Sequence, residues 1–165
     1  MELDIRKNLG FIGLPDFSWS FNGALIKSRV EFAKGSKEEN RPMQGQSPYL
    51  VNTGFFYKNA KQQLDIALLY NRIGKRIVGV GRTEGGGDAS RNIRVPDSYE
   101  MPRDGFDLTA SKRWGRWEAK LAIRDLLNQS IVFKQFQTVG DKEIQQVTRK
   151  YKPGRNINLS VTVTL

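Results

Sequence analysis

Four carboxylates in the sequence have the residue type that general acid–base catalysis requires. They are Asp65, Asp107, Glu118 and Asp125. Such catalysis needs two carboxyl groups held close to a substrate, whereas these four are scattered along segments in which polar and apolar residues alternate. Carboxylates on the polar side of such segments are the usual content of a hydrated surface. We therefore predict that the protein is not an enzyme.

The composition excludes several other kinds of site. The chain has 165 residues and contains neither cysteine nor histidine, so disulfide frameworks, thiolate metal sites and histidine-based triads are excluded. The glycine-rich stretch GRTEGGGDAS lacks the Gly-Lys-Ser/Thr ending of a phosphate-binding loop, and no helix clearly follows it. We interpret this stretch as a flexible loop and predict neither a cofactor nor a metal site.

Basic residues are the remaining candidates for a chemical role. The formal net charge is +10, from 27 Lys and Arg against 17 Asp and Glu, which favours anionic partners such as nucleic acid or lipid. These charges are spread over turns and form no dense basic block. Guanidinium groups pair well with carboxylates and phosphates, so arginines in a loop near 81–103 are candidate contacts for an anionic ligand. The alternatives are solvated loop charge and contact with lipopolysaccharide phosphates. The four arginines are Arg82, Arg91, Arg94 and Arg103.

Seven stretches alternate between apolar and polar residues with a period of two, which predicts β-strands with one apolar and one polar face. In the last one, five apolar residues alternate with Asn, Ser and Thr. The sequence thus predicts an all-β chain, an antiparallel up-and-down meander of about seven strands. The expected strands cover residues 3–9, 17–25, 49–57, 64–70, 106–110, 117–123 and 157–165. The apolar residues of the last strand are Ile157, Leu159, Val161, Val163 and Leu165.

One stretch, EAKLAIRDLLNQS, is ambiguous because its apolar residues also fit helical spacing. The tight glycine-centred reversal KRWGRW immediately before it favours a strand, since a hairpin fits such a turn. We interpret the stretch as a strand that ends near Ile123.

The breaks between strands alternate in length. Short turns at GLPD, 58–62 and Gly115 alternate with long loops near 34–46, 81–103 and 137–153. A soluble β-sandwich could bury the same apolar faces as a core, but it has no reason to keep this order. An outer-membrane barrel does, because its periplasmic turns are short and its extracellular loops are long.

Aromatic residues gather beside the short turns, which is where a barrel places its interfacial girdle. The residues predicted to form the girdle are Trp19, Tyr57, Trp114 and Trp117. In a barrel the apolar residues of the last strand would face lipid, and the opposite parity would line a hydrated lumen or meet a plug.

The first residues, MELDIRKNLGFIG, lack the basic segment followed by an apolar segment that marks a secretory signal. Either the protein is cytoplasmic or the chain is a piece of something longer. We expect a fragment or truncated product that cannot close a working barrel by itself, because seven strands leave two open edges.

Three motifs carry a family resemblance. They are RPMQGQSPYLVNTGFFY, LAIRDLLNQSIVF and YKPGRNINLSVTVTL, in this order. Through them nearly the whole chain resembles the C-terminal barrel portion of TonB-dependent outer-membrane receptors of the type common in Bacteroidota. One departure is Leu165, since outer-membrane proteins usually end in an aromatic residue.

The resemblance implies that residues 1–165 form a single region, the C-terminal part of a transmembrane barrel of about 22 strands. The plug domain and signal peptide would lie outside this region. The implied function is import of a scarce nutrient, such as a metal chelate, cobalamin or a glycan, without catalysis. The implied partners are the remainder of the barrel and its plug, TonB through that plug, and outer-membrane lipid. The resemblance leaves open a surface lipoprotein as a further partner and implies no nucleic acid.

The alternative is a soluble basic β-protein that binds nucleic acid or another polyanion. Interleaved aromatic and cationic residues, as in SKRWGRW, could stack on bases. This hypothesis requires a protein that is monodisperse without detergent and whose affinity falls steeply with salt.

Overall fold

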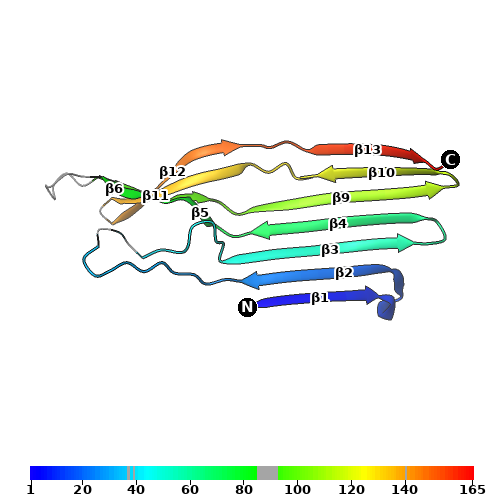
Figure 1. Ribbon diagram of the computed structural model, residues 1–165, viewed down its shortest axis with the longest axis horizontal. Coiled ribbons are helices and arrows are strands. Elements are labelled where there is room, and N and C mark those ends of the chain that lie inside the picture. Colours follow the sequence, from blue (N-terminus) through cyan, green and yellow to red (C-terminus); the bar gives the residue numbers. More distant parts are fainter. Residues whose placement is uncertain (37, 39, 85–92, 140) are drawn as a thin grey trace.

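A computed structural model describes residues 1–36, 38, 40–84, 93–139 and 141–165. Its main element is a seven-stranded antiparallel sheet in the order β1-β2-β3-β4-β9-β10-β13 (Figure 1). The expectation of an all-β antiparallel meander of seven strands is confirmed. These strands are β1 (Glu2–Leu9), β2 (Leu14–Leu25), β3 (Tyr49–Asn59), β4 (Leu64–Ile73), β9 (Arg103–Trp114), β10 (Trp117–Arg124) and β13 (Asn156–Val163).

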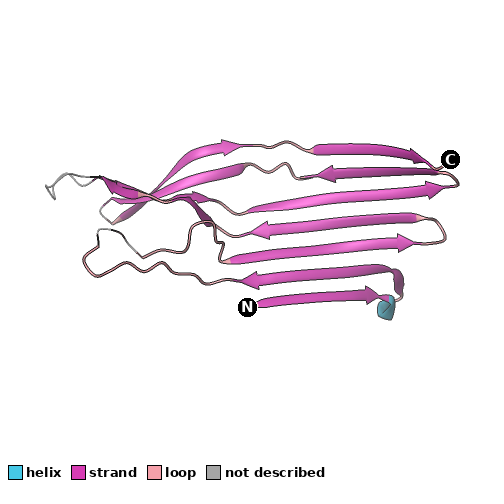
Figure 2. Cartoon of the chain, in the orientation of Figure 1, coloured by secondary structure: helices cyan, strands magenta, loops and turns pink. Residues whose placement is uncertain are grey.

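A smaller sheet extends beyond one end of the main sheet (Figure 2). Its four strands lie in the order β12-β11-β8-β5, and we call it the loop sheet. β6 (Arg82–Glu84) and β7 (Ile93–Val95) form a separate two-stranded pair. The strands of the loop sheet are β5 (Arg76–Gly79), β8 (Ser98–Glu100), β11 (Ile131–Val139) and β12 (Lys142–Tyr151).

The connections between strands of the main sheet alternate in length as expected. At one end the short connections are the 3₁₀ turn η1 (Gly10–Ile12) with Gly13, residues 60–63, and residues 115–116. At the other end the connections 26–48, 74–102 and 125–155 are long, and the last two carry the loop sheet (Figure 1).

Two expectations for the long connections were wrong. The expected polar loop near 137–153 holds all of β12. The expected loop near 81–103 holds β6, β7 and β8, and its residues 85–92 lie outside the described residues. The apolar residues of β12, which are Ile144, Val147 and Tyr151, do not share one parity, so the segment has no period-two pattern that would predict a strand. Its regularity comes instead from the backbone ladder with β11.

The β9–β10 hairpin settles the ambiguous stretch as strand. Trp114 lies opposite Trp117, and Gly115 between them has φ 58°, a left-handed conformation that glycine adopts without steric cost. The strand ends at Arg124, and Asp125, with φ 54°, turns the chain away.

Gly74 lies where the chain leaves the main sheet for the loop sheet. A Cβ atom at this position would come within 2.8 Å of both Ser47 Oγ and the Tyr49 ring. The Gly74 amide also donates to the Tyr49 carbonyl at 3.0 Å. Glycine at 74 therefore allows the end of the connection 26–48, which we call the arm before β3, to pack closely against the backbone at Gly74.

Among the described residues, the main sheet has no second layer and few side chains are buried. Within the described part of the chain, the buried hydrophobic side chain is Ile77 of the loop sheet, at 1% exposure, and the buried polar one is Ser47. None of the described segments is a helix with the length and apolar character needed to cross a membrane.

Candidate functional site

The register of the seven strands joins their apolar residues into one continuous surface, which we call the apolar face. One row across the sheet runs through Phe17, Tyr57, Ile66, Ala110 and Leu121, and it ends at Leu159. Residues that pair across neighbouring strands point to the same face of the sheet. Because successive side chains of a strand point to opposite faces, every second row belongs to the apolar face.

Large apolar side chains on this face are open to the surroundings. On β13, Ile157 is 66% exposed, Leu159 69% and Val161 56%. Soluble monomers rarely expose contiguous apolar patches of more than a few hundred Å². The remaining exposed apolar side chains of this face include Leu3, Phe17, Leu25, Phe55, Leu68, Trp114, Trp117 and Val163.

Aromatic rings border the apolar face at the end with the short turns. Phe17 and Tyr57 have ring centroids 4.8 Å apart, and Trp114 and Trp117 flank the β9–β10 turn. The structure therefore places three predicted girdle residues beside short turns. Trp19, the fourth, lies two residues farther along β2 from the turn than Phe17, where it is opposite Phe55.

A second aromatic group, for which the sequence pattern gave no signal, lies toward the opposite end of the same face. Tyr70 and Phe106 are neighbours on β4 and β9 with ring centroids 4.9 Å apart. Tyr49 begins β3 nearby, and its hydroxyl accepts a hydrogen bond from Arg72 Nε at 3.3 Å.

Polar atoms between the two aromatic groups are satisfied within the sheet. The indole N–H of Trp19 donates to Thr53 Oγ1 at 2.7 Å, and the Thr53 hydroxyl donates to the Ser20 carbonyl at 2.8 Å. Lysines on this face lie near the short turns, where Lys112 donates to the Gln62 carbonyl and Lys7 lies over the Phe11 ring.

Arg72 and Asp104 close the apolar face at its long-connection end. Their ion pair measures 2.6 Å between Arg72 Nη1 and Asp104 Oδ1, and the Tyr70 hydroxyl donates to the same oxygen at 2.7 Å. Gln129 accepts from the Asp104 amide at 3.0 Å. In the sequence, Arg72 and Asp104 occupy the positions at which the apolar residues of β4 and β9 recur, and this was the available signal that they share the apolar face.

The opposite surface, which we call the polar face, carries amides and charges along its length. Asn22, Asn52 and Asn71 lie level on β2, β3 and β4, and Asn71 Nδ2 donates to Asn52 Oδ1 at 2.6 Å. They line an open hollow of about 750 Å³ together with Asp4 and Arg6. Such a surface suits contact with water or with a polar ligand or segment.

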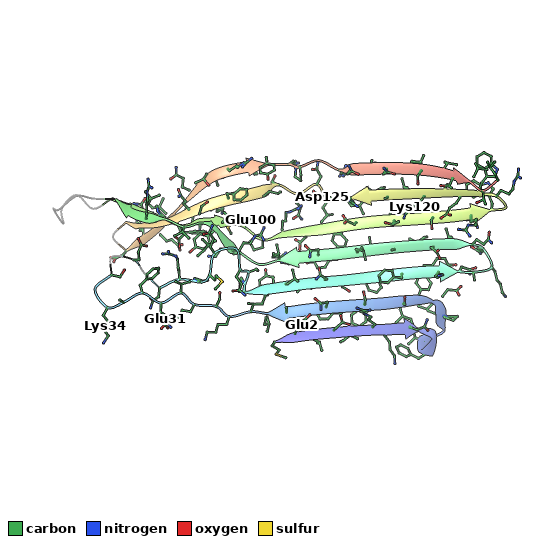
Figure 3. The ribbon with its side chains drawn as sticks, in the orientation of Figure 1. Glu2, Glu31, Lys34, Glu100, Lys120 and Asp125 are labelled. Carbon is green, nitrogen blue, oxygen red and sulfur yellow. The ribbon has the colours of Figure 1, made fainter. Side chains whose placement is uncertain are left out.

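The four candidate carboxylates all lie on or beside the polar face, in two pairs. The Asp125 amide donates to Asp107 Oδ1 at 2.9 Å, at the end of β10 where Figure 3 labels Asp125. Asp65 and Glu118 line another hollow near the short turns, where Glu118 accepts from Arg113 at 2.9 Å. Among the described residues, no three His, Cys, Asp or Glu side chains gather as a metal-binding group.

The structure describes three of the four candidate arginines, and they lie on three different strands of two sheets. Arg82 is the first residue of β6 and Arg94 the middle residue of β7, opposite Thr83. Arg91 lies outside the described residues. Arg103 is the first residue of β9, and its Nη1 lies 3.3 Å from Asp125 Oδ2.

The Arg103–Asp125 pair has a structural role that can be tested. The pair is partly shielded, with side-chain exposures of 32% and 16%. We expect Arg103→Gln to reduce local stability by on the order of 1 kcal/mol, since the ion pair is only partly removed from solvent. Hydrogen exchange of the amides from Asp125 to Asn128 would become faster by a corresponding factor.

The matched control is Arg113→Gln. Arg113 pairs with Glu118, but the two side chains are 59% and 38% exposed, so we expect little change in exchange. Unchanged exchange around Asp125 in the Arg103 variant would contradict the structural role and restore Arg103 as a candidate ligand contact.

No protein-family model matches the chain, and no curated protein or solved structure matches it either.

Proposed function

We propose that the main sheet is part of a transmembrane β-barrel in a bacterial outer membrane, and that this barrel belongs to a TonB-dependent receptor that imports a scarce nutrient. The observation that carries the proposal is a single-layered sheet whose apolar face is uncovered among the described residues. In a barrel, hydrocarbon is the solvent for that face.

The spacing of the aromatic residues supports a membrane span. Phe106 and Trp114 are eight residues apart on β9, which corresponds to about 26 Å at a rise of about 3.3 Å per residue. Tyr49 and Tyr57 have the same separation on β3. At the strand tilt of about 35–45° usual in barrels, this length projects to about 19–22 Å along the membrane normal. The apolar band of an outer-membrane barrel is about 25 Å tall and is flanked by aromatic girdles.

The stagger of the girdle supports a tilted sheet. Across the sheet, Phe17 on β2 lies in the same row as Leu121 on β10. Along β10, Trp117 lies four residues from Leu121 in the direction of the short turns. The two strands are four positions apart in the sheet. With about 3.3 Å per residue and about 4.8 Å between strands, a line through these aromatic residues implies a strand tilt of about 35°. Barrel strands tilt by about 35–45°.

The polar atoms on the apolar face also fit a lipid environment. Hydrocarbon offers no hydrogen bonds, so a polar group there must be satisfied internally. The Trp19–Thr53–Ser20 chain meets this requirement. Lys7, Lys112 and the Arg72–Asp104 pair lie toward the two ends of the strands, where long polar side chains reach the interface.

The direction of the edge strands constrains what completes the barrel. Among the described residues β1 and β13 each have one unpaired edge, and both run toward the short turns (Figure 1). Pairing β1 with β13, within a chain or around a ring of copies, would therefore be parallel. An antiparallel barrel needs an odd number of further strands, which is consistent with the even total usual in outer-membrane barrels.

The transport role rests on the resemblance together with the polar face and the long connections at one end of the strands. The polar face would meet the lumen and a plug, and the long connections would lie outside the cell. Nutrient, plug, TonB and a surface lipoprotein are partners in this proposal, and no catalysis is involved. The anionic-ligand role of Arg82, Arg91 and Arg94 belongs to it as well.

A soluble polyanion-binding protein is the competing hypothesis. It would need a second layer over the apolar face, and none of the described elements supplies one. Recovery of the protein in the soluble fraction, with salt-dependent binding to nucleic acid, would favour it over the barrel.

A parity scan along β13 tests the membrane assignment. The chain contains no cysteine, so single cysteines at positions 157 to 163 can carry an environment-sensitive fluorophore. The gene is altered at its natural chromosomal position, and the isolated membrane fraction is labelled. We expect nitroxide lipids to quench odd-numbered positions and aqueous iodide to quench even-numbered ones, because strand side chains alternate. A pattern without alternation would reject the barrel.

A separate measurement tests import. A strain lacking the gene is compared with its parent for energy-dependent uptake of a labelled ferric chelate, cobalamin and an oligosaccharide. Reduced uptake of one of them supports the receptor. Equal uptake of all three in both strains would overturn the importer assignment while leaving the parity scan unaffected.

A further inference from the structure

The 3₁₀ turn η1, together with Leu14 at the start of β2, presents an unusually apolar surface for a short connection. Phe11 is 71% exposed, Ile12 58% and Leu14 43%. The other two short connections of the sheet, residues 60–63 and 115–116, read AKQQ and GR. Solvent alone gives no reason for three large apolar side chains at the tip of one turn.

The turn is held in a defined conformation. The Gly10 amide donates to Asn8 Oδ1 at 2.7 Å, and Asn8 Nδ2 donates to the Pro15 carbonyl at 3.0 Å. The Gly13 amide donates to the Gly10 carbonyl at 3.0 Å, with Gly13 at φ 83°. These hydrogen bonds fix the conformation of the turn, and the Asn8 side chain links the strands on its two sides.

The tip is continuous with the apolar face. Lys7 has the parity of that face, since it lies opposite Trp19, and its Nζ atom is 5.6 Å from the centre of the Phe11 ring. Figure 1 places η1 at the short-turn end of the β1–β2 edge. An ammonium beside exposed apolar side chains has the composition of segments that lie in a membrane interface and meet anionic headgroups.

We propose that η1 is an interfacial anchor: Phe11, Ile12 and Leu14 enter the headgroup–acyl boundary of the leaflet on the short-turn side, and Lys7 binds a lipid phosphate. This inference rests on the proposed membrane location of the sheet. It adds a lipid-binding site on a connection that a barrel would otherwise leave in water.

Fluorescence quenching of three single-cysteine variants tests the anchor. Ile12→Cys reports on η1, Gln62→Cys on the polar turn, and Val161→Cys on the apolar face. Each carries the same fluorophore, in protein taken from its native membrane and reconstituted into mixed phosphatidylcholine and phosphatidylglycerol vesicles. We expect nitroxide lipid to quench positions 12 and 161 and iodide to quench position 62.

The outcomes separate the anchor from the barrel. If position 161 is quenched by lipid but position 12 behaves like position 62, η1 meets water or a protein and the anchor is overturned. If position 161 is itself quenched by iodide, the membrane assignment of the sheet fails first.

A second arm tests Lys7. Quenching by lipid at position 12 should be stronger in vesicles with phosphatidylglycerol than in pure phosphatidylcholine, and Lys7→Gln should abolish that difference, since the attraction to anionic headgroups is electrostatic. Equal quenching in both lipids before the substitution would overturn the phosphate contact.

Discussion

Replacing Val161 by arginine is expected to lower the free energy of unfolding of the membrane-inserted protein by about 2–4 kcal/mol. Val161 lies on the apolar face, opposite Ala119 of β10, and is 56% exposed. In the barrel, its surroundings would be hydrocarbon, and a guanidinium there loses its hydration without gaining a partner. Titration with guanidinium chloride of the protein reconstituted into phospholipid vesicles, followed by tryptophan fluorescence, would measure the loss.

The matched control is Thr162→Arg on the adjacent residue. Thr162 belongs to the polar face and lies opposite Glu118, so the new charge would find water and an opposite charge. We expect a change within about 0.5 kcal/mol, as for an ordinary surface substitution. Equal losses at 161 and 162 would contradict the assignment of the apolar face to lipid.

Ile77→Ala is expected to destabilise the loop sheet by about 2–5 kcal/mol, since it removes buried methyl groups and leaves a cavity. Ile77 is 1% exposed and lies opposite Tyr99 on β8. Its carbonyl accepts from the Gly45 amide at 2.8 Å, which ties the arm before β3 to the same point. Hydrogen exchange of β5, β8 and Gly45 would accelerate together.

The control for Ile77 is Val80→Ala, which shortens a side chain that is 41% exposed. We expect its effect on exchange to correspond to less than about 0.5 kcal/mol. If the two substitutions have equal effects, Ile77 is not the centre of the loop sheet. If Ile77→Ala also loosens β9 and β10, the loop sheet and the main sheet unfold as one unit.

The loop sheet carries two aromatic clusters that contain cations. Lys75 Nζ lies 4.8 Å from the Tyr99 ring and 4.7 Å from the Phe136 ring, and Arg149 lies 4.7 Å from the Tyr151 ring. Arg76 makes a two-nitrogen contact with Glu100, at 3.0 and 2.7 Å. Cation–π contacts and paired charges of this kind add to the small apolar core around Ile77.

The sequence by itself determined the seven strands of the main sheet, their two-faced character and the order of short and long connections. These are local properties. A period of two assigns each side chain to a face, and a left-handed glycine such as Gly115 determines where a hairpin turns. Hence even the helix-like stretch after Trp117 was predicted as strand from the turn that precedes it.

Tertiary structure alone decided which distant residues come into contact and which polar segments form strands. Arg72 forms an ion pair with Asp104, and Arg103 forms one with Asp125, because the register of β4, β9 and β10 brings these residues together. β12 is a strand through its pairing with β11, not through a buried face. Alternation is the same in a sandwich and in a barrel wall, since it records only which side of a strand is apolar. Whether anything covers that side is set by non-local packing, and in the described residues the apolar face stands open.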